Sequence, residues 1–308
     1  MDNCMRKLLF SALCALFACI GASPARAELF VGVTTSNQLV TFDGAALGSF
    51  STMFTLSGVA VGQTIRSLDY RPANGVLYGL GIDDGNPTLG QVYTLNVANG
   101  AATPIGGALA LAGNTSVLAS IDFNPVVDAL RVVGGQGQNY RVNANTGALI
   151  ARDTDLALPN SSPGSPLGIA YTNNLAGATQ TTLYAFEVSN DSIYTIGGVN
   201  GSPSPNGGAM QLVGPAGVSA LNQVGGFDIS GATGIGYINF APDGVGLDNL
   251  YTVNLASGAL SLVGNIGDSL RDITVIPGTA AVPEPSAMAF AALGAIGFAV
   301  MARRRRAA

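Results

Sequence analysis

At 308 residues the chain can form one large domain or two small ones; only 10% of its residues are charged, and 42 are glycine. It has no histidine, its single lysine is Lys7, and its three cysteines all precede residue 20. Residues after position 20 therefore contain no Cys, His or Lys. This excludes disulfides, Cys or His zinc sites, His-based triads and Walker-type phosphate loops there, so no cofactor is expected. Residues 28–281 contain 16 acidic residues and six arginines, a net charge of −10, which disfavours nucleic acid as a partner.

Residues 1–27 have the three regions of a secretory signal peptide. A basic start at residues 6–7 precedes an apolar run over residues 8–20, which we expect to form the signal helix. Small residues then place the expected cleavage site, which is formed by Ala25, Ala27 and Glu28. We therefore predict export by Sec-type machinery and cleavage by signal peptidase after Ala27. Lipoprotein processing at Cys19 is the alternative, disfavoured by the bulky residue two positions before it.

A strand pattern then recurs five times, at intervals of 53, 47, 54 and 57 residues. Its clearest copy is residues 249–258, where apolar and β-branched residues alternate with polar ones and a Ser-Gly turn follows. The copies share one position, which is occupied by Val40, Tyr93, Tyr140, Tyr194 and Tyr251. Such a period indicates radial β-repeats, each of them a small four-stranded antiparallel sheet.

A second recurring pattern marks the first strand of each repeat. It reads Asp-aromatic-x-Pro at Asp69 and Asp122, has Ala170 in place of the aspartate in the third repeat, and resumes at Asp228. Residues 270–277, which include Asp272, resemble another first strand with no later strands behind them. The three strands expected at residues 28–34, 38–43 and 50–56 lack a first strand of their own.

Pairing these two ends completes a fifth blade and removes an exposed sheet edge. We therefore predict an all-β, five-bladed β-propeller over residues 28–281, with its last blade closed by the N- and C-terminal strands. A six-bladed propeller and a two-sheet β-sandwich are the alternatives. Two loops rich in Pro, Gly, Ser and Asn, residues 150–167 and 199–213, are predicted to be surface excursions that rim one face.

Two repeated side-chain types are candidates for chemistry. The aspartates hold a cation near the axis or cap backbone N–H groups at the following turn; we favour capping, which explains the period without a ligand. The tyrosines form a sugar platform or pack between blades, and we favour packing. The acidic loop at residues 83–86 lacks calcium-loop spacing, and the glycines at residues 134–137 do not lead into a helix as a dinucleotide-binding motif requires. No catalytic or metal-binding residue is singled out.

The C-terminal residues 282–308 have three parts. The first is a short motif, formed by Val282, Pro283, Glu284 and Pro285. An apolar run over residues 286–302 follows, about 25 Å long as a helix and just sufficient to span a bilayer. The last part is a basic cluster, which holds that end in the cytoplasm by the positive-inside rule and consists of Arg303, Arg304, Arg305 and Arg306. A plain membrane anchor is one interpretation.

This order of parts closely resembles the PEP-CTERM sorting signal of exported bacterial proteins. The resemblance implies that an exosortase-type transpeptidase recognises Pro283, Glu284 and Pro285 and removes the tail, and it suggests a Gram-negative host that makes exopolysaccharide. The implied route is an intermediate anchored in the inner membrane with the propeller outside the cytoplasm, followed by release to the cell surface. The body resembles a domain family of unknown function, which implies no activity.

The lack of His, Cys and Lys in the repeat region favours a non-catalytic surface or matrix protein. Without His, Cys or Lys in residues 28–281, acid–base chemistry at neutral pH is left to carboxylates or tyrosine, and none stands out from the repeat. We expect a binding scaffold for a neutral glycan, an exopolysaccharide or another surface protein. The alternative is a secreted glycosidase or lyase, which would need two carboxylates about 5–10 Å apart in one concave site.

Overall fold

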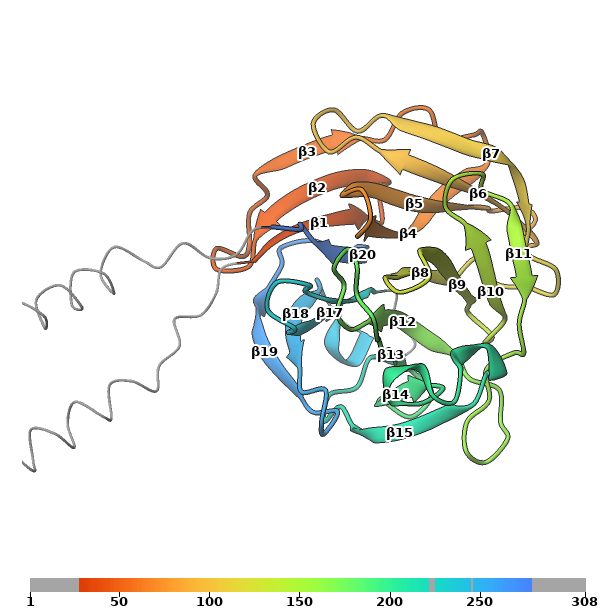
Figure 1. Ribbon diagram of the computed structural model, residues 1–308. Coiled ribbons are helices and arrows are strands. Elements are labelled where there is room, and N and C mark those ends of the chain that lie inside the picture. The colour runs from red at the N-terminus through yellow and green to blue at the C-terminus, as the bar shows by residue number, and fades with distance from the viewer. Residues whose placement is uncertain (1–27, 222–224, 245, 279–308) are drawn as a thin grey trace, which may run out of the picture. The chain divides into compact units, whose positions relative to one another are not determined.

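The computed structural model describes residues 28–221, 225–244 and 246–278. They belong to one compact unit, Glu28–Thr279, in which five four-stranded antiparallel sheets are arranged around a common axis (Figure 1). We number these sheets as blades 1 to 5. The described residues thus form the five-bladed β-propeller that the repeats predict, and neither a sixth blade nor a sandwich occurs among them.

Each blade runs from an inner strand near the axis to an outer strand at the rim. Blade 1 contains β4 (Gln63–Arg71), β5 (Val76–Asp83), β6 (Leu89–Leu95) and β7 (Ala102–Ala110). Blade 2 contains β8 (Ala119–Asn124), β9 (Ala129–Gly134), β10 (Asn139–Asn143) and β11 (Leu149–Arg152). Blade 3 contains β12 (Pro166–Tyr171), β13 (Leu183–Glu187), β14 (Ser192–Ile196) and β15 (Met210–Pro215). Blade 4 contains β16 (Phe227–Ile229), β17 (Gly236–Phe240), β18 (Asn249–Val253) and β19 (Leu260–Asn265).

Blade 5 joins the two ends of the chain, as predicted. Its order is β20 (Leu270–Val275), β1 (Leu29–Thr34), β2 (Gln38–Asp43) and β3 (Thr52–Thr55). β20 pairs with β1 in antiparallel register, so that Gly32 faces Ile273. A Cβ atom on Gly32 would lie 2.7 Å from Leu270 Cδ1 and 3.3 Å from Asp272 O, so a larger residue here would require the Leu270 side chain to shift. The closure pairs the two strands that would otherwise be edges.

The hydrophobic core lies between neighbouring blades. One cluster joins Tyr140 and Val142 of blade 2 to Leu80 and Val92 of blade 1, and equivalent clusters occupy the other four junctions. The repeated tyrosines are at most 5% exposed: Tyr93, Tyr140, Tyr194 and Tyr251. The tyrosine of the second repeat donates a hydrogen bond to Ala112 O at 3.0 Å. They therefore pack between blades, as favoured, and form no exposed sugar platform.

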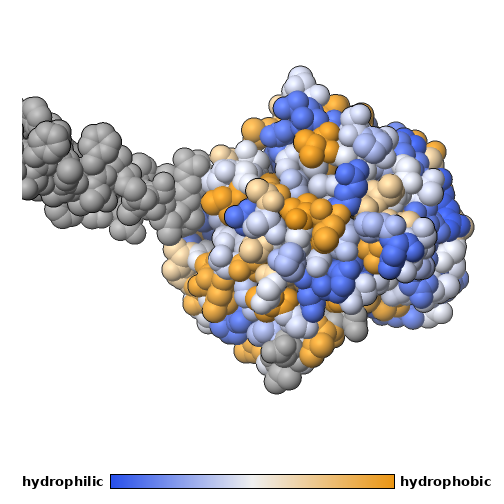
Figure 2. All heavy atoms as spheres, turned by 90° about the horizontal axis from the view of Figure 1, so that it is seen from below, coloured by the Kyte–Doolittle hydropathy of each residue, from blue (hydrophilic) through white to orange (hydrophobic). Residues whose placement is uncertain are grey.

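Exposed large hydrophobic residues occur on several outer strands, which pack on one side only. Examples are Met53 on β3, Leu149 on β11, Leu212 on β15 and Leu262 on β19. Viewed from below, hydrophobic residues occur as separate patches among hydrophilic ones (Figure 2). Within the described ranges no helix is long and apolar enough to cross a membrane. The expected signal helix and the apolar run over residues 286–302 lie outside those ranges.

Candidate functional site

Two layers of inner-strand side chains link each blade to the next near the axis. In the first layer, the Oγ atoms of Ser67 and Ser120 accept backbone N–H hydrogen bonds of 2.9 and 3.0 Å from the next blade. In the second, Asp69 Oδ2, Asp122 Oδ1 and Asp228 Oδ2 do the same at 2.8, 3.1 and 2.6 Å. The aspartates therefore do accept backbone N–H groups. However, these N–H groups belong to the neighbouring blade. The expectation that the aspartates cap the turn that follows them was therefore wrong.

Asp272 does not continue the repeated aspartate series. Its Oδ2 accepts the N–H of Leu68 at 2.8 Å and the hydroxyl of Ser67, so it occupies the serine layer. The fifth position in the aspartate layer is held by Thr274, whose hydroxyl donates to Asp228 Oδ2 at 2.9 Å. A proline lies three residues after Asp69, Asp122 and Thr274, though not after Ala170 or Asp228, and it is the sequence signal that places Thr274 in the aspartate layer.

The axial carboxyl groups are the described residues that could hold a metal ion. One oxygen each from Asp69, Asp122 and Asp228 lies within 4.8 Å of the others. Oxygen ligands of this kind suit Ca²⁺ or Mg²⁺, but these residues are only 1–3% exposed and each already accepts a backbone N–H.

Burial raises the pKa of all four axial carboxyl groups, and the negative charges of their neighbours add to the effect at Asp69 and Asp122. For Asp272 burial raises the pKa to about 8. The neutral, protonated form is therefore favoured at Asp69, Asp122 and Asp272, whose pKa values are raised most. Because they are buried, these acids form no concave site of the kind a glycosidase needs.

A second candidate site is a cavity of about 430 Å³ between blades 2 and 3, which we call the interblade cavity. It lies where β8 and β12 end, and the two predicted loops contribute to its wall. Its polar lining includes Thr179, Gln180, Thr181, Asn200, Ser204 and Asn206. The loops meet through an N–H···O bond of 3.1 Å from Thr154 to Asn206 and through a bridge between Ala157 and Ala209. Parts of both predicted excursions are strands, β11 and β15.

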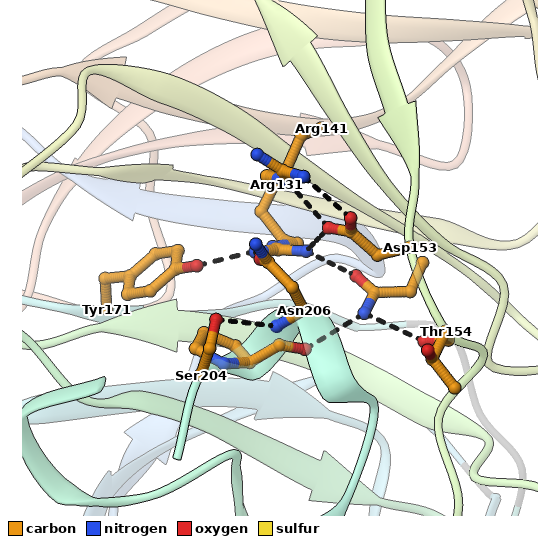
Figure 3. Close-up of polar contacts among 9 residues, drawn as sticks. Arg131, Arg141, Asp153, Thr154, Tyr171, Ser204 and Asn206 are labelled. Atoms are coloured by element: carbon orange, nitrogen blue, oxygen red, sulfur yellow. Dashed lines mark hydrogen bonds and ion pairs between the residues drawn. The ribbon is translucent and has the colours of Figure 1, made fainter. Parts of the chain in front are cut away.

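A buried arginine network supports the inner wall of this cavity (Figure 3). Arg131, 2% exposed, donates to Tyr171 Oη at 3.3 Å and to Asp153 Oδ2 at 2.8 Å. It also donates to Asn139 Oδ1 and Asn206 Oδ1, each at 2.7 Å. Asp153 is shared with Arg141, which binds both of its oxygens at 2.7 and 2.8 Å. Arg131 therefore ties blade 2 to blade 3 and to the loop that contains Asn206.

Charge pairing controls ionisation in this network. Burial alone would raise the pKa of Asp153, but the hydrogen bond from Arg141 and the charges of both arginines hold it below its usual value. The network is consequently charged at neutral pH. Nothing in the sequence singles out Arg131, because its partners come from β10, the end of β12 and two loops.

The expected processing residues lie largely outside the described ranges. Of the cleavage site, only Glu28 is described; it is 1% exposed, and its Oε1 accepts hydroxyl hydrogen bonds from Ser230 and Thr233 at 2.9 and 2.8 Å. Ala25 and Ala27 are outside the described part, as are the sorting motif at residues 282–285 and the arginines at residues 303–306.

The fold and the interblade cavity define a five-bladed β-propeller with one polar cavity between two of its blades. The chain belongs to the family of the domain of unknown function DUF4394, whose model matches residues 38–274. Residues 281–306 match the PEP-CTERM protein-sorting motif. This motif marks the chain for exosortase-dependent sorting and export toward the cell envelope or surface, as the resemblance implied.

Three solved structures have a similar chain course at low identity. The crystal structure of a nidogen/laminin complex is 11% identical, with a TM-score of 0.44, over 81% of this chain and 98% of that one. Glutaminyl cyclase of Myxococcus xanthus is 11% identical, with a TM-score of 0.42, over 74% of this chain and 98% of that one. TolB of Acinetobacter baumannii is 10% identical, with a TM-score of 0.46, over 85% of this chain and 70% of that one. Similarity at this level carries no information about ligand or activity. Comparison with curated proteins gives no match.

Proposed function

We propose that this protein is a non-catalytic binding propeller that takes a neutral glycan into the interblade cavity at the cell surface or outside the cell. The observation that carries the proposal is the lining of that cavity. Amide and hydroxyl side chains such as Gln180, Asn200 and Ser204 offer donors and acceptors that match sugar hydroxyl groups. Val126, Val127 and Ile150 add exposed aliphatic surface for the sugar rings.

The arginines in the wall favour a neutral ligand over a charged one. Four donor bonds of Arg131 are used inside the protein, and Arg141 holds Asp153 with two. Recognition then rests on the uncharged side chains. Among the described residues that line this cavity none is acidic, so a pair of catalytic carboxylates has no support there.

The route to the surface belongs to the same proposal. Signal peptidase cuts after Ala27, the apolar run over residues 286–302 holds an intermediate in the inner membrane, and an exosortase-type transpeptidase cuts at Pro283, Glu284 and Pro285. Mass spectrometry of the surface-associated protein is expected to show a start at Glu28 and an end near Glu284. Recovery of Arg306 in the mature pool would support a plain membrane anchor instead.

The test of the binding function uses residues 28–279, which contain every described contact of the propeller. Retention on polysaccharide purified from the producing cells, without new reducing ends, is expected. Gln180→Ala and Asn200→Gly should each weaken binding about three- to tenfold, the effect of one lost hydrogen bond. Glycine is the appropriate replacement at Asn200 because its φ is 56°.

Asn37→Gly is the matched control, since Asn37 also has a positive φ, 61°, but lies at the β1–β2 turn outside the cavity. Unchanged binding by the double variant Gln180→Ala/Asn200→Gly would contradict this site. Release of oligosaccharides that stops when one carboxylate is changed would replace binding with hydrolysis or lyase activity.

A further inference from the structure

A second cavity, of about 240 Å³, opens on the propeller axis at the N-terminal ends of the inner strands. Every blade contributes the residue that immediately precedes its first-layer position: Arg66, Ala119, Leu167, Gly225 and Arg271. We call this cavity the axial mouth. It is lined by a ring with one residue from each of the five blades, and its two arginines come from neighbouring blades, 1 and 5.

Strand irregularities bring these side chains to the mouth. The register between β4 and β5 shifts at Arg66, that between β12 and β13 shifts at Leu167, and that between β20 and β1 shifts at Arg271. A bulge adds one residue to a strand and redirects its side chain, and bulges occur often beside binding sites. The same device at the same level of three blades places two cations and one apolar side chain around one opening.

The positive charge at the mouth exceeds the negative charge that balances it. Asp84 accepts a hydrogen bond from Arg66, but it is 48% exposed and is the one acidic partner of that arginine among the described residues. Arg271 has no carboxylate within ion-pair distance in the described part; it donates to the backbone carbonyl oxygens of Thr34, at 2.7 Å, and Thr35. Burial lowers the pKa of Arg271, and the charge of Arg66 lowers it further, while the charge of Asp84 offsets part of this effect.

An unused donor accompanies this excess charge. The Nε atom of Arg66 is buried and has no hydrogen-bond partner among the described residues. An unsatisfied buried donor is costly, and a ligand that accepts its hydrogen bond removes the cost. The excess charge and the free donor point to the same missing group, an anionic acceptor.

We propose that the axial mouth binds a small organic carboxylate, with its carboxylate group held between Arg66 and Arg271. The planar guanidinium fork matches a carboxylate through paired hydrogen bonds. Leu118, Leu167 and Val188 line the rest of the cavity and provide an apolar surface for the body of the ligand. The site is separate from the interblade cavity, which lies where the inner strands end, so neither proposal depends on the other.

Calorimetric titration of residues 28–279 with butyrate and benzoate tests the site, with butyramide and benzamide as neutral probes of the same shape. Inorganic phosphate tests for an anion without an apolar body. We expect saturable binding of the carboxylates, weakened by added NaCl, with little binding of the amides and weaker binding of phosphate. Glucuronate and its oligomers then show whether a free or a polymer-borne carboxylate is preferred.

Three substitutions are expected to change carboxylate affinity, two of them downward and one upward. Arg66→Gln and Arg271→Gln should each lower carboxylate affinity about tenfold or more, because each removes a charge-assisted bond. Asp84→Asn should raise affinity severalfold, because it removes the competing negative charge. Arg152→Gln is the control, since it breaks an ion pair with an equally exposed aspartate, Asp155, away from the mouth.

The proposal is overturned if no carboxylate binds saturably, if the amides bind equally well, or if Asp84→Asn weakens binding. Arg271 also holds the β1–β2 turn through Thr34 and Thr35, so Arg271→Gln can fail to fold. In that case Arg66→Gln and Asp84→Asn still test whether the mouth binds a carboxylate.

Discussion

The interblade cavity and the axial mouth each contain two arginines, but only at the interblade cavity do both arginines pair with one aspartate, Asp153; at the mouth Asp84 pairs with Arg66 alone. At the interblade cavity, Arg131 makes four hydrogen bonds inside the protein, and Asp153 is 6% exposed. At the mouth, Arg66 has a free buried Nε, and Asp84 is 48% exposed. The comparison shows that two pairs of arginines with the same charge can have different roles. Arg131, with four of its five N–H donors used inside the protein, holds the fold together, whereas the free donor of Arg66 beside a cavity supports the ligand role proposed above.

The largest expected difference is in stability. Arg131→Met should lower the free energy of unfolding by about 3–5 kcal/mol, because it leaves Asn139, Asn206 and Tyr171 without their buried donor. Arg66→Met should cost less than about 1 kcal/mol, as is usual for a pair with an exposed partner. Urea denaturation of both variants measures the difference, and equal losses would remove the distinction between the two regions.

The next effect concerns the side chain directly below the mouth. Asp272→Ala should cost about 2–4 kcal/mol, because the donors of Ser67 and Leu68 lose their buried acceptor and blade 5 loses a link to blade 1. Asp272→Asn keeps an acceptor and resembles the neutral acid, so its cost should be clearly smaller. Thermal unfolding with matched buffers compares the two; an alanine variant as stable as the asparagine variant would contradict a linking role.

The axial acids also predict how stability changes with pH. Their raised pKa values mean that the folded protein holds protons which the unfolded chain releases above about pH 4. Their stabilising contribution is therefore complete below about pH 4 and declines as pH rises toward about 8, by at most about 1.4 kcal/mol per pH unit for each group.

Unfolding free energies from pH 5 to pH 8 should consequently fall, with a smaller slope in Asp272→Asn. Asp84 and Asp153, whose pKa values are lowered, affect stability mainly below about pH 4 and do not disturb this range. A rise in stability between pH 5 and pH 8 would contradict protonated carboxyl groups at the axis.

The smallest effect on stability should come from Asp84→Asn, less than about 1 kcal/mol, because Asp84 is half exposed and asparagine can still accept from Thr64. Asp153→Asn is its matched partner at the other arginine pair and should cost more, since Asp153 is buried. Chemical denaturation of the two variants sharpens the comparison; the reverse order would contradict it.

Much of the fold could be predicted from the sequence. The strand recurring at about fifty residues determined the number of blades, and the unpaired first strand at residues 270–277 determined how the ring closes. The tyrosine at one fixed strand position indicated packing between blades. These features are readable because alternation and turn signals are local, and a repeat presents them several times.

The sites depended on tertiary structure. Arg66 and Arg271 are 205 residues apart in the chain and become neighbours only because the ring closes and both strands bulge at the same level. The two-residue difference that moves Asp272 into the serine layer is set by strand register, which the aspartate by itself does not reveal. How many donors of an arginine are used inside the protein depends on partners from several strands and loops, as for Arg131. A sequence pattern determines which face of a strand is buried, but only the closed propeller determines which side chains meet there.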